Sequence, residues 1–490
     1  MSIKFDAEYD VVVIGGGGSG LSAAVQVARN GNTCAVLEKG STTGGSSSFA
    51  EGHAAFESDE QEKRGIHVSK TEAFNTYMDY SHWRADPALI SRFVENAATT
   101  IVKMRDEIGA HYENVEITAP DQPGELVTWH LPEGEVARVI ELLEADAIRR
   151  GVDLFMSTSA TEVLRENGKI IGVKAIDADG QEVILGAKAV IVGTGGYANN
   201  PEMMDKYAKY NIGKDLINVG AEGNTGDGIK MVLEAGGIEN PNIGTRLLFP
   251  LMRDKTITSH TNAAGFQPYF WVDQTGKRFV NEIVGLNFGH AGDVVASLPG
   301  AMYWSILSKE SIDHLVNIGN DVGLGIYVRN YEKLVNLSNE IAADATDKDR
   351  TNVLSAGTIE ELATKMKIAP SILRAEVDEY NNYCDAGEDK KFHKRAKYLH
   401  TIKEGPFYAI KMETGIMITM GALQINEYME ALNSDHEPIS GLYVVGCDAG
   451  GLYGESYTLP IPGSANGFAL TSGWLAADDI SEKIKSGKLK

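Results

Sequence analysis

The sequence predicts an α/β fold in which a parallel-sheet, dinucleotide-binding domain is interrupted by an inserted α+β domain. Two observations predict it. A strand, a glycine-rich turn, a helix and a second strand follow one another within residues 9–38. Residues 187–197 and 441–451 also have the pattern of a buried strand followed by glycines, whereas residues 248–418 contain no such nucleotide-binding pattern. Because the nucleotide segments lie on both sides of that stretch, we expect it to be an insertion. Before it we expect an acidic helical section at 70–108, and within it a hairpin at 270–280 followed by helices at 331–343 and 358–367.

The first unit begins with residues 9–14, which have the pattern of a buried strand and lead directly into a G-x-G-x-x-G turn. Gly15 permits the tight turn, and Gly17 lets the backbone approach a pyrophosphate. Gly20 lets the helix expected at 21–29 pack closely on the strand. This order of strand, glycines and helix predicts a Rossmann-like nucleotide site.

The start of that helix, with Gly18 and Ser19, directs free N–H groups and the positive end of the helix dipole at the phosphates. A second strand at 33–37 ends at Glu38, where a carboxylate can accept both hydroxyls of an adenosine ribose. This unit alone does not distinguish FAD from NAD.

The loop at residues 44–55 favours FAD, because its small and hydroxyl residues can lie flat against a large planar ring. Two later strands, ending near 192 and 445, run into further small residues, and residues 225–228 open a helix expected at 229–235. The candidate FAD contacts beyond the first turn are Lys39, Gly44, Gly45, Ser46, Ser47, Gly52, His53, Ala160, Thr194, Gly195, Gly196, Asp227, Asp448, Gly463, Ser464 and Ala465.

These segments resemble the flavoprotein family of soluble fumarate reductases, succinate dehydrogenase flavoprotein subunits and 3-ketosteroid dehydrogenases. Similar segments cover 9–55, 141–228, 276–282 and 405–477. The resemblance implies a glutathione-reductase-like FAD-binding domain at 1–247 and 419–490, with a capping domain at 248–418 that closes over the flavin. Succinate dehydrogenases carry a flavin-linking histidine in the first loop, where this chain has Ser46 and Ser47, so we expect non-covalent FAD.

Composition limits the partners. The net charge of -23 opposes nucleic-acid binding, which depends on basic patches. No apolar run reaches the length of a membrane span, and the first ten residues lack the shape of a signal peptide. We therefore expect a cytoplasmic protein.

The cysteines and histidines indicate no metal centre. Cys34, Cys384 and Cys447 are far apart and lack C-x-x-C spacing, which excludes a c-type haem or a cysteine-ligated iron–sulfur cluster within the chain. No other metal-ligand spacing appears, so no metal is expected. Electrons are expected to come from, or go to, an external donor or acceptor.

The likeness to fumarate reductases weakens at the substrate positions. Leu286 stands where the family has its proton-donating arginine, after the segment Arg278–Glu282. Ile418 stands where the family has a carboxylate-binding histidine, and the segment with the second carboxylate arginine is replaced by 454–464. A site without these cations does not suit a dicarboxylate, so fumarate itself is not expected as the substrate.

The C-terminal segment 463–474 is closer to the ketosteroid dehydrogenases, which carry a tyrosine before a proline–glycine pair. Tyr457 is the first candidate for a hydroxyl that hydrogen-bonds a ketone oxygen, although two extra residues separate it from Gly463 relative to that family. Tyr453 and His290 are further catalytic candidates, and Arg246 and Arg253 are side chains that could enter the same pocket.

We therefore expect an FAD-dependent oxidoreductase that moves a hydride between flavin N5 and a C=C or CH–CH bond conjugated to a carbonyl, as an enone or enoate reductase. Two alternatives stay open. One is a desaturase of a 3-ketosteroid or cyclic ketone, and the other is a protein that binds flavin without turnover. The substrate, the direction, the electron partner and the oligomeric state are not determined by the sequence.

Overall fold

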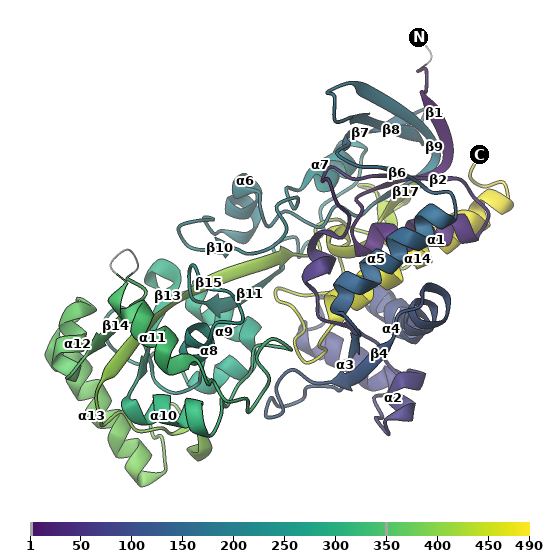
Figure 1. Ribbon diagram of the computed structural model, residues 1–490. Helices are drawn as coiled ribbons and strands as arrows, with labels where there is room; N and C mark the ends of the chain where they lie inside the picture. Colours follow the sequence, from purple (N-terminus) through teal and green to yellow (C-terminus); the bar gives the residue numbers. More distant parts are fainter. Residues whose placement is uncertain (1–2, 348–350) are drawn as a thin grey trace.

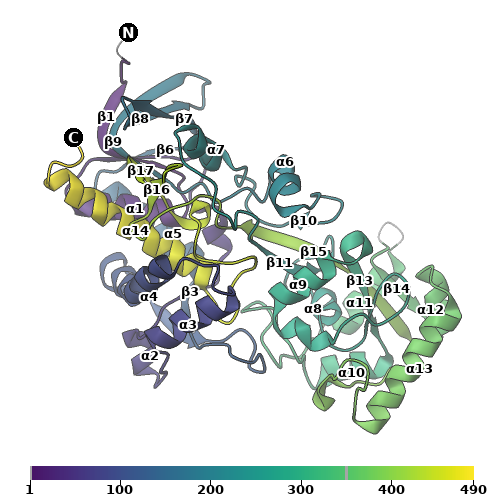
Figure 2. The same cartoon turned by 180° about the vertical axis from the view of Figure 1, so that it is seen from behind.

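The computed structural model describes residues 3–347 and 351–490 and shows two lobes (Figures 1 and 2). The first strand and the last helix lie in the same lobe. Strand β15 (Phe407–Thr419) runs from one lobe into the other, and β11 (Arg246–Leu251) pairs antiparallel with it. The predicted α/β fold is confirmed at this level.

The first lobe contains an eight-stranded sheet with the order β16-β17-β9-β1-β2-β6, to which β8 and β7 are added beside β9. Four pairs are parallel: β1 with β2, β1 with β9, β9 with β17 and β2 with β6. The apolar second half of β1, residues 11–14, is fully buried and explains the central place of the strand, because a strand buried on both faces is apolar. The strands are β1 (Ala7–Ile14), β2 (Cys34–Leu37), β6 (Asp153–Phe155), β7 (Ser159–Glu166), β8 (Lys169–Ile176), β9 (Glu182–Val192), β16 (Glu430–Leu432) and β17 (Pro438–Val444).

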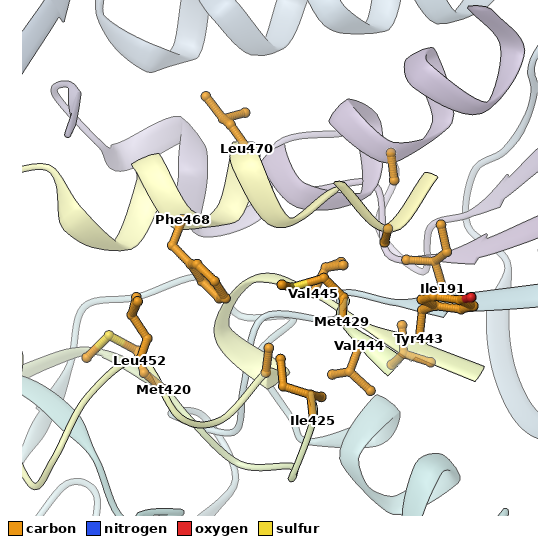
Figure 3. Close-up of a cluster of buried hydrophobic side chains, with 14 of the residues drawn as sticks. Ile191, Met420, Ile425, Met429, Tyr443, Val444, Val445, Leu452, Phe468 and Leu470 are labelled. Atoms are coloured by element: carbon orange, nitrogen blue, oxygen red, sulfur yellow. The ribbon is translucent and has the colours of Figure 1, made fainter. Parts of the chain in front are cut away.

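Helices α1 (Gly18–Arg29) and α14 (Ser464–Lys485) pack against each other, and α5 (Glu135–Arg149) packs beside α1. The two helices approach so closely that a Cβ on Gly473 would lie 2.2 Å from the carbonyl oxygen of Ser19. Figure 3 shows the apolar cluster beneath α14, in which Phe468 lies near Val445 and Leu452. The helix begins at Gly18, three residues before the predicted start, because the glycine turn is itself part of the first helical turn.

A small three-stranded sheet and several helices complete this lobe. The sheet has the order β3-β5-β4. The helical section predicted at 70–108 is divided into separate helices, among them α3 and α4. Asp86 caps α4 by accepting hydrogen bonds from the N–H groups of Ala88 and Leu89. The elements are β3 (His53–Ala54), β4 (Tyr112–Glu116), β5 (Trp129–Pro132), α2 (Asp59–Lys63), α3 (Lys70–Tyr80), α4 (Pro87–Val102), α6 (Pro201–Met203) and α7 (Asp227–Glu234).

The second lobe is built on a six-stranded sheet around β15, with the order β10-β15-β13-β12 and with β11 and β14 also paired to β15. Most of its pairs are antiparallel. Its other strands are β10 (Ile217–Asn218), β12 (Trp271–Val272), β13 (Met302–Leu307) and β14 (Val353–Ala356), and its helices are α8 (His260–Gly265), α9 (Phe288–Ala296), α10 (Lys309–Asn317), α11 (Leu337–Thr346), α12 (Ile359–Lys365) and α13 (Pro370–Ala386).

Two predictions for this lobe were inaccurate. The hairpin expected at 270–280 is absent: the turn forms, with the N–H of Gly276 donating to the carbonyl of Asp273, but β12 pairs with β13 instead. The helix expected at 331–343 is α11, which begins later, at Leu337. The domain limits 1–247, 248–418 and 419–490 stay predictions. Within the described residues, no helix combines the length and apolar character that a membrane span requires.

Candidate active site

The turn between β1 and α1 is formed by glycines that leave no room for side chains. A Cβ on Gly20 would lie 1.9 Å from the carbonyl oxygen of Gly15, and Gly15 itself has a φ of 105°. Gly17 caps α1 without a side-chain hydrogen bond, and no acidic residue lies in the first turn. The first N–H groups of α1 therefore face outward without a side-chain cap, as an anion-binding helix start requires.

The acidic residue at the end of β2 lies beside this turn. The two carboxylate oxygens of Glu38 accept hydrogen bonds from the N–H groups of Gly16 (2.8 Å) and Gly40 (2.6 Å). Lys39 and Asp227, both predicted cofactor contacts, form an ion pair with each other at 2.7 Å. Ala160 lies on β7, opposite Ala175 of β8.

The loop after β2 is held between two other segments. The side-chain amide of Asn224 donates to Ser46 Oγ (2.8 Å), and that of Asn466 donates to Ser47 Oγ (3.1 Å). Gly44, with a φ of 110°, has no room for a Cβ because Ser48 Oγ would lie 2.0 Å away. The loop is therefore fixed between the segment before α7 and the start of α14.

Asp448, a predicted cofactor contact, lies beneath the turn at residues 194–196. Its side chain is fully buried and accepts hydrogen bonds from Thr194 Oγ1 (2.8 Å) and the N–H of Gly196 (2.8 Å). Burial raises the pKa of this carboxyl. In this structure Asp448 stabilises the turn that holds Thr194, Gly195 and Gly196, and its acceptor capacity is used inside the protein.

A cavity lies between the two lobes beside this loop. It contains ≈ 1370 Å³ of space not filled by protein atoms, part of which is open to solvent. One side is formed by residues of the first lobe and the other by residues of the second. The first-lobe side includes Ser46, Ser47, Gly52, Gly463, Ala465 and Asn466, and the second-lobe side includes Leu247, Phe249, Leu286, Phe288, Leu324 and Ile418.

The cavity wall is almost entirely apolar. Among the described residues that line it, Glu51, Cys447 and Tyr457 are the ionisable ones, and arginine, lysine and histidine are absent. The two arginines expected near this site are paired elsewhere: Arg246 lies 3.7 Å from Asp293, and Arg253 lies 3.0 Å from Glu413.

Leu286 and Ile418 lie in this cavity, and their side chains are almost completely buried. They were singled out because they replace an arginine and a histidine of the fumarate reductases. The structure thus brings two apolar replacements from distant parts of the chain to one wall.

Glu51 is the single carboxyl in the cavity wall and was not among the predicted site residues. One of its oxygens accepts a hydrogen bond from the N–H of Ile326 (2.9 Å), and both lie against Gly325 of the second lobe. Burial, and secondarily the nearby Glu135, raise the pKa of Glu51 to about 7. A carboxylate within a run of small residues was the sequence signal for this group.

The two predicted tyrosines lie in different surroundings. Tyr457 lines the cavity. Burial raises the pKa of its hydroxyl, and this effect outweighs the lowering of the pKa by the nearby N–H groups of Gly463, Ser464 and Ala465. Tyr453 does not line the cavity, and its hydroxyl forms a 2.7 Å hydrogen bond with Ser464 Oγ. Tyr457 therefore keeps its place as a catalytic candidate, whereas Tyr453 occupies a structural position.

The structure places neither predicted histidine in the cavity wall. His290 lies on α9, exposed, with its Nε2 2.7 Å from the Tyr80 hydroxyl. His53 is fully buried on β3, where its Nε2 contacts the Tyr112 hydroxyl at 2.5 Å. Burial lowers the pKa of His53 to about 3, so its imidazole is neutral at physiological pH.

The arrangement fits a bound dinucleotide. The uncapped start of α1 suits a pyrophosphate, and the loop at 44–53 continues from it into the cavity. The start of α14, capped by Gly463 without a side chain or an acidic residue, presents further N–H groups at that end of the cavity. Asn466 Oδ1 is buried there without a hydrogen-bond partner. Fold and site together define a nucleotide-binding α/β protein with an apolar reaction pocket between its lobes.

Comparison with known proteins identifies the nucleotide. A family model described as an FAD binding domain matches residues 10–460, and the chain belongs to this family. Vinyl phenol reductase of Lactiplantibacillus plantarum is 36% identical over 484 residues, with 96% of each chain covered. 3-Oxosteroid 1-dehydrogenase of Mycolicibacterium smegmatis is 24% identical, with 97% of each chain covered.

Among solved structures, the open conformation of a flavocytochrome c3 fumarate reductase has the same fold, with a TM-score of 0.76 and 22% identity over 98% of this chain and 79% of that one. The predicted cofactor is thus confirmed as FAD. The protein is an FAD-dependent oxidoreductase of the class that acts on C=C and CH–CH bonds, as predicted.

Proposed function

We propose that the protein reduces a carbon–carbon double bond in an uncharged, conjugated substrate, and that a vinyl phenol is the substrate class. The observation that carries this proposal is the cavity wall, which is apolar and contains one carboxyl and one tyrosine but no cation among its described residues. A dicarboxylate buried there would lack any compensating charge. The full-length similarity to vinyl phenol reductase supports the same substrate class.

FAD is held, in this proposal, by the residues that the sequence singled out. The turn Gly15–Gly20 would hold the pyrophosphate, Glu38 the ribose, and the loop from Gly44 to His53 the ring. The start of α14, Gly463–Ala465, would supply N–H groups to the ring. Because Ser46 and Ser47 stand where a linking histidine is found in succinate dehydrogenases, we propose that FAD is bound without a covalent bond.

The second lobe acts as a cap in this proposal. The segment around residues 320–331 connects it to the first lobe through contacts that include the N–H of Ile326 with Glu51, the Tyr327 hydroxyl with Glu135 (2.7 Å), and Arg329 with Glu116 (2.7 Å). We propose that these contacts limit the access of water to the apolar wall.

When bound, the flavin would supply the hydride, and side chains of the protein accept and donate the protons. Glu51, with a pKa of about 7, is ionised in part at neutral pH and accepts the phenolic proton of the substrate. Tyr457, whose pKa is raised by burial, keeps its proton and donates it to the terminal vinyl carbon. The phenol O–H bond breaks and a C–H bond forms, which leaves a quinone methide that is electrophilic at the benzylic carbon.

Hydride addition at that carbon then gives the ethyl phenolate. Return of the proton from Glu51 to the phenolate oxygen gives the ethyl phenol, and solvent reprotonates Tyr457. The net change is the gain of one hydride and one proton by the substrate. The hydride comes from an external electron donor by way of the flavin.

The test is anaerobic reoxidation of the photoreduced protein, followed by flavin absorbance. We expect rapid reoxidation by 4-vinylphenol, slower reoxidation by 2-cyclohexenone, and none by acrylate or fumarate. Equal rates with fumarate would contradict an uncharged substrate. Bleaching of the oxidised flavin by a saturated cyclic ketone would instead support the desaturase alternative, and the absence of any reaction would support a flavin-binding protein without turnover.

A further inference from the structure

Three side chains of the second lobe form a cluster that the proposed reaction does not use. His314 lies in the last turn of α10, Asp321 follows that helix, and His400 lies in the segment before β15. One nitrogen or oxygen from each lies within 4.8 Å of the other two. The residues are distant in sequence, which is why no metal-ligand spacing was visible there.

The polar contacts within the cluster are incomplete. His400 Nε2 and Asp321 Oδ2 form an ion pair at 3.2 Å, but both atoms are buried and neither makes a hydrogen bond of acceptable geometry. The hydroxyl of Tyr269, whose ring centroid lies 4.0 Å from that of His400, lies near Asp321 and is also buried without a well-formed hydrogen bond. Unpartnered buried polar atoms are unfavourable unless a ligand satisfies them.

We infer that His314, Asp321 and His400 bind a divalent transition metal ion, with Zn²⁺ as the best match. Two imidazoles and one carboxylate form a ligand set that suits zinc, whereas magnesium and calcium prefer oxygen ligands. Tetrahedral coordination places neighbouring ligand atoms about 3.3 Å apart. The His400–Asp321 separation already has this value, and His314 must move by roughly an ångström to complete the set.

The ion would fix the segment that closes the cavity. Asp321 directly precedes Val322–Gly325, which line the cavity, and the Gln267 side chain already accepts hydrogen bonds from the N–H groups of Asp321 (2.9 Å) and Val322 (3.1 Å). Coordination of Asp321 would join this segment to α10 and to the chain before β15. With three protein ligands, the fourth coordination position of the ion would stay open for water.

Zinc binding tests the inference on tag-free protein with FAD bound. After dialysis against a chelator, Zn²⁺ is titrated in competition with a chromophoric indicator. We expect one tightly bound equivalent, and a loss of affinity of about tenfold or more in His314→Ala, His400→Ala and Asp321→Asn. The matched control is His67→Ala, which removes an exposed histidine of the first lobe and should bind zinc like the wild type.

Two results would overturn the inference: no binding by the wild type, or equal binding by the wild type and all three cluster variants. The flavin spectrum and thermal midpoint of each variant show whether it has folded. If the variants do not fold, X-ray absorption of the zinc-loaded wild type decides. Two imidazole ligands support the site, and a shell without imidazole refutes it.

Discussion

Replacing Glu51 with Gln removes the single carboxyl from the described cavity wall while keeping its size. In the proposed reaction this carboxyl accepts the substrate proton, so only its ionised form is active. Burial raises its pKa from 4.5 to about 7. The wild-type kcat/KM for 4-vinylphenol should therefore rise with pH up to about 7 and then level off.

The magnitude follows from that pKa. About nine-tenths of Glu51 is ionised at pH 8 and about 3% at pH 5.5. Loss of a general base slows turnover by about 10²–10⁴-fold, so Glu51→Gln should show that deficit at pH 8. At pH 5.5 the deficit should be about 30-fold smaller, because the wild type has itself lost its base.

The same substitution changes stability in a defined direction. The folded protein binds a proton at Glu51 between pH 4.5 and about 7, whereas the unfolded chain does not. The free energy of unfolding therefore falls as pH rises through this range, by up to about 3 kcal/mol. Glu51→Gln lacks this term, so the stability difference between the variant and the wild type should grow in favour of the variant as pH rises.

The assay is stopped-flow reoxidation of photoreduced protein at several pH values, combined with denaturant unfolding at the same values. Glu62→Gln is the control, because it removes an exposed carboxyl of the same lobe and should change neither profile. A variant with the wild-type pH profile would refute the role of Glu51 as base.

Three further predictions concern other parts of the site. Tyr457→Phe should slow reduction by about 10²-fold with FAD retained. Tyr453→Phe removes the hydrogen bond to Ser464, so it should lower the free energy of unfolding by about 1 kcal/mol in denaturant and leave the rate nearly unchanged. Equal effects of the two substitutions on the rate would contradict this assignment. Gly20→Ala places a Cβ 1.9 Å from a backbone carbonyl and should give protein that purifies without flavin colour. Leu286→Arg should raise the reoxidation rate with acrylate relative to 4-vinylphenol, and an unchanged ratio would argue against this cavity as the substrate site.

The nucleotide-binding part of the fold was predictable because its signals are local. A buried strand, a glycine turn and a helix are determined by neighbouring residues, and β1, α1 and β2 lie within a few residues of the predicted limits. The second lobe was less predictable, because its pairings are non-local. Residues 270–280 have the local pattern of a hairpin, yet β12 pairs with β13, which lies about thirty residues further along.

In the candidate site, too, some residues were predictable from the sequence and others were not. Leu286, Ile418 and Tyr457 were each identified from family motifs, and the structure brings them into one cavity. Glu51 was missed because its importance depends on which side of a loop faces the second lobe. His290 stays a prediction, although it is not among the residues that line the cavity, because the motif that precedes it does not determine which face of α9 meets the cavity.

The electrostatic character of the cavity connects these residues. At the positions where the resemblance places an arginine and a histidine, Leu286 and Ile418 provide no charge, and the effect of burial on the pKa of Glu51 outweighs the lowering by Ile326 N–H and Arg329. Replacing cations by apolar side chains therefore has two consequences. In the proposed function it disfavours dicarboxylates, and it leaves Glu51 with a pKa near neutrality. A base of that strength suits a phenolic proton better than a carboxylic one, because a carboxylic acid is already ionised at neutral pH.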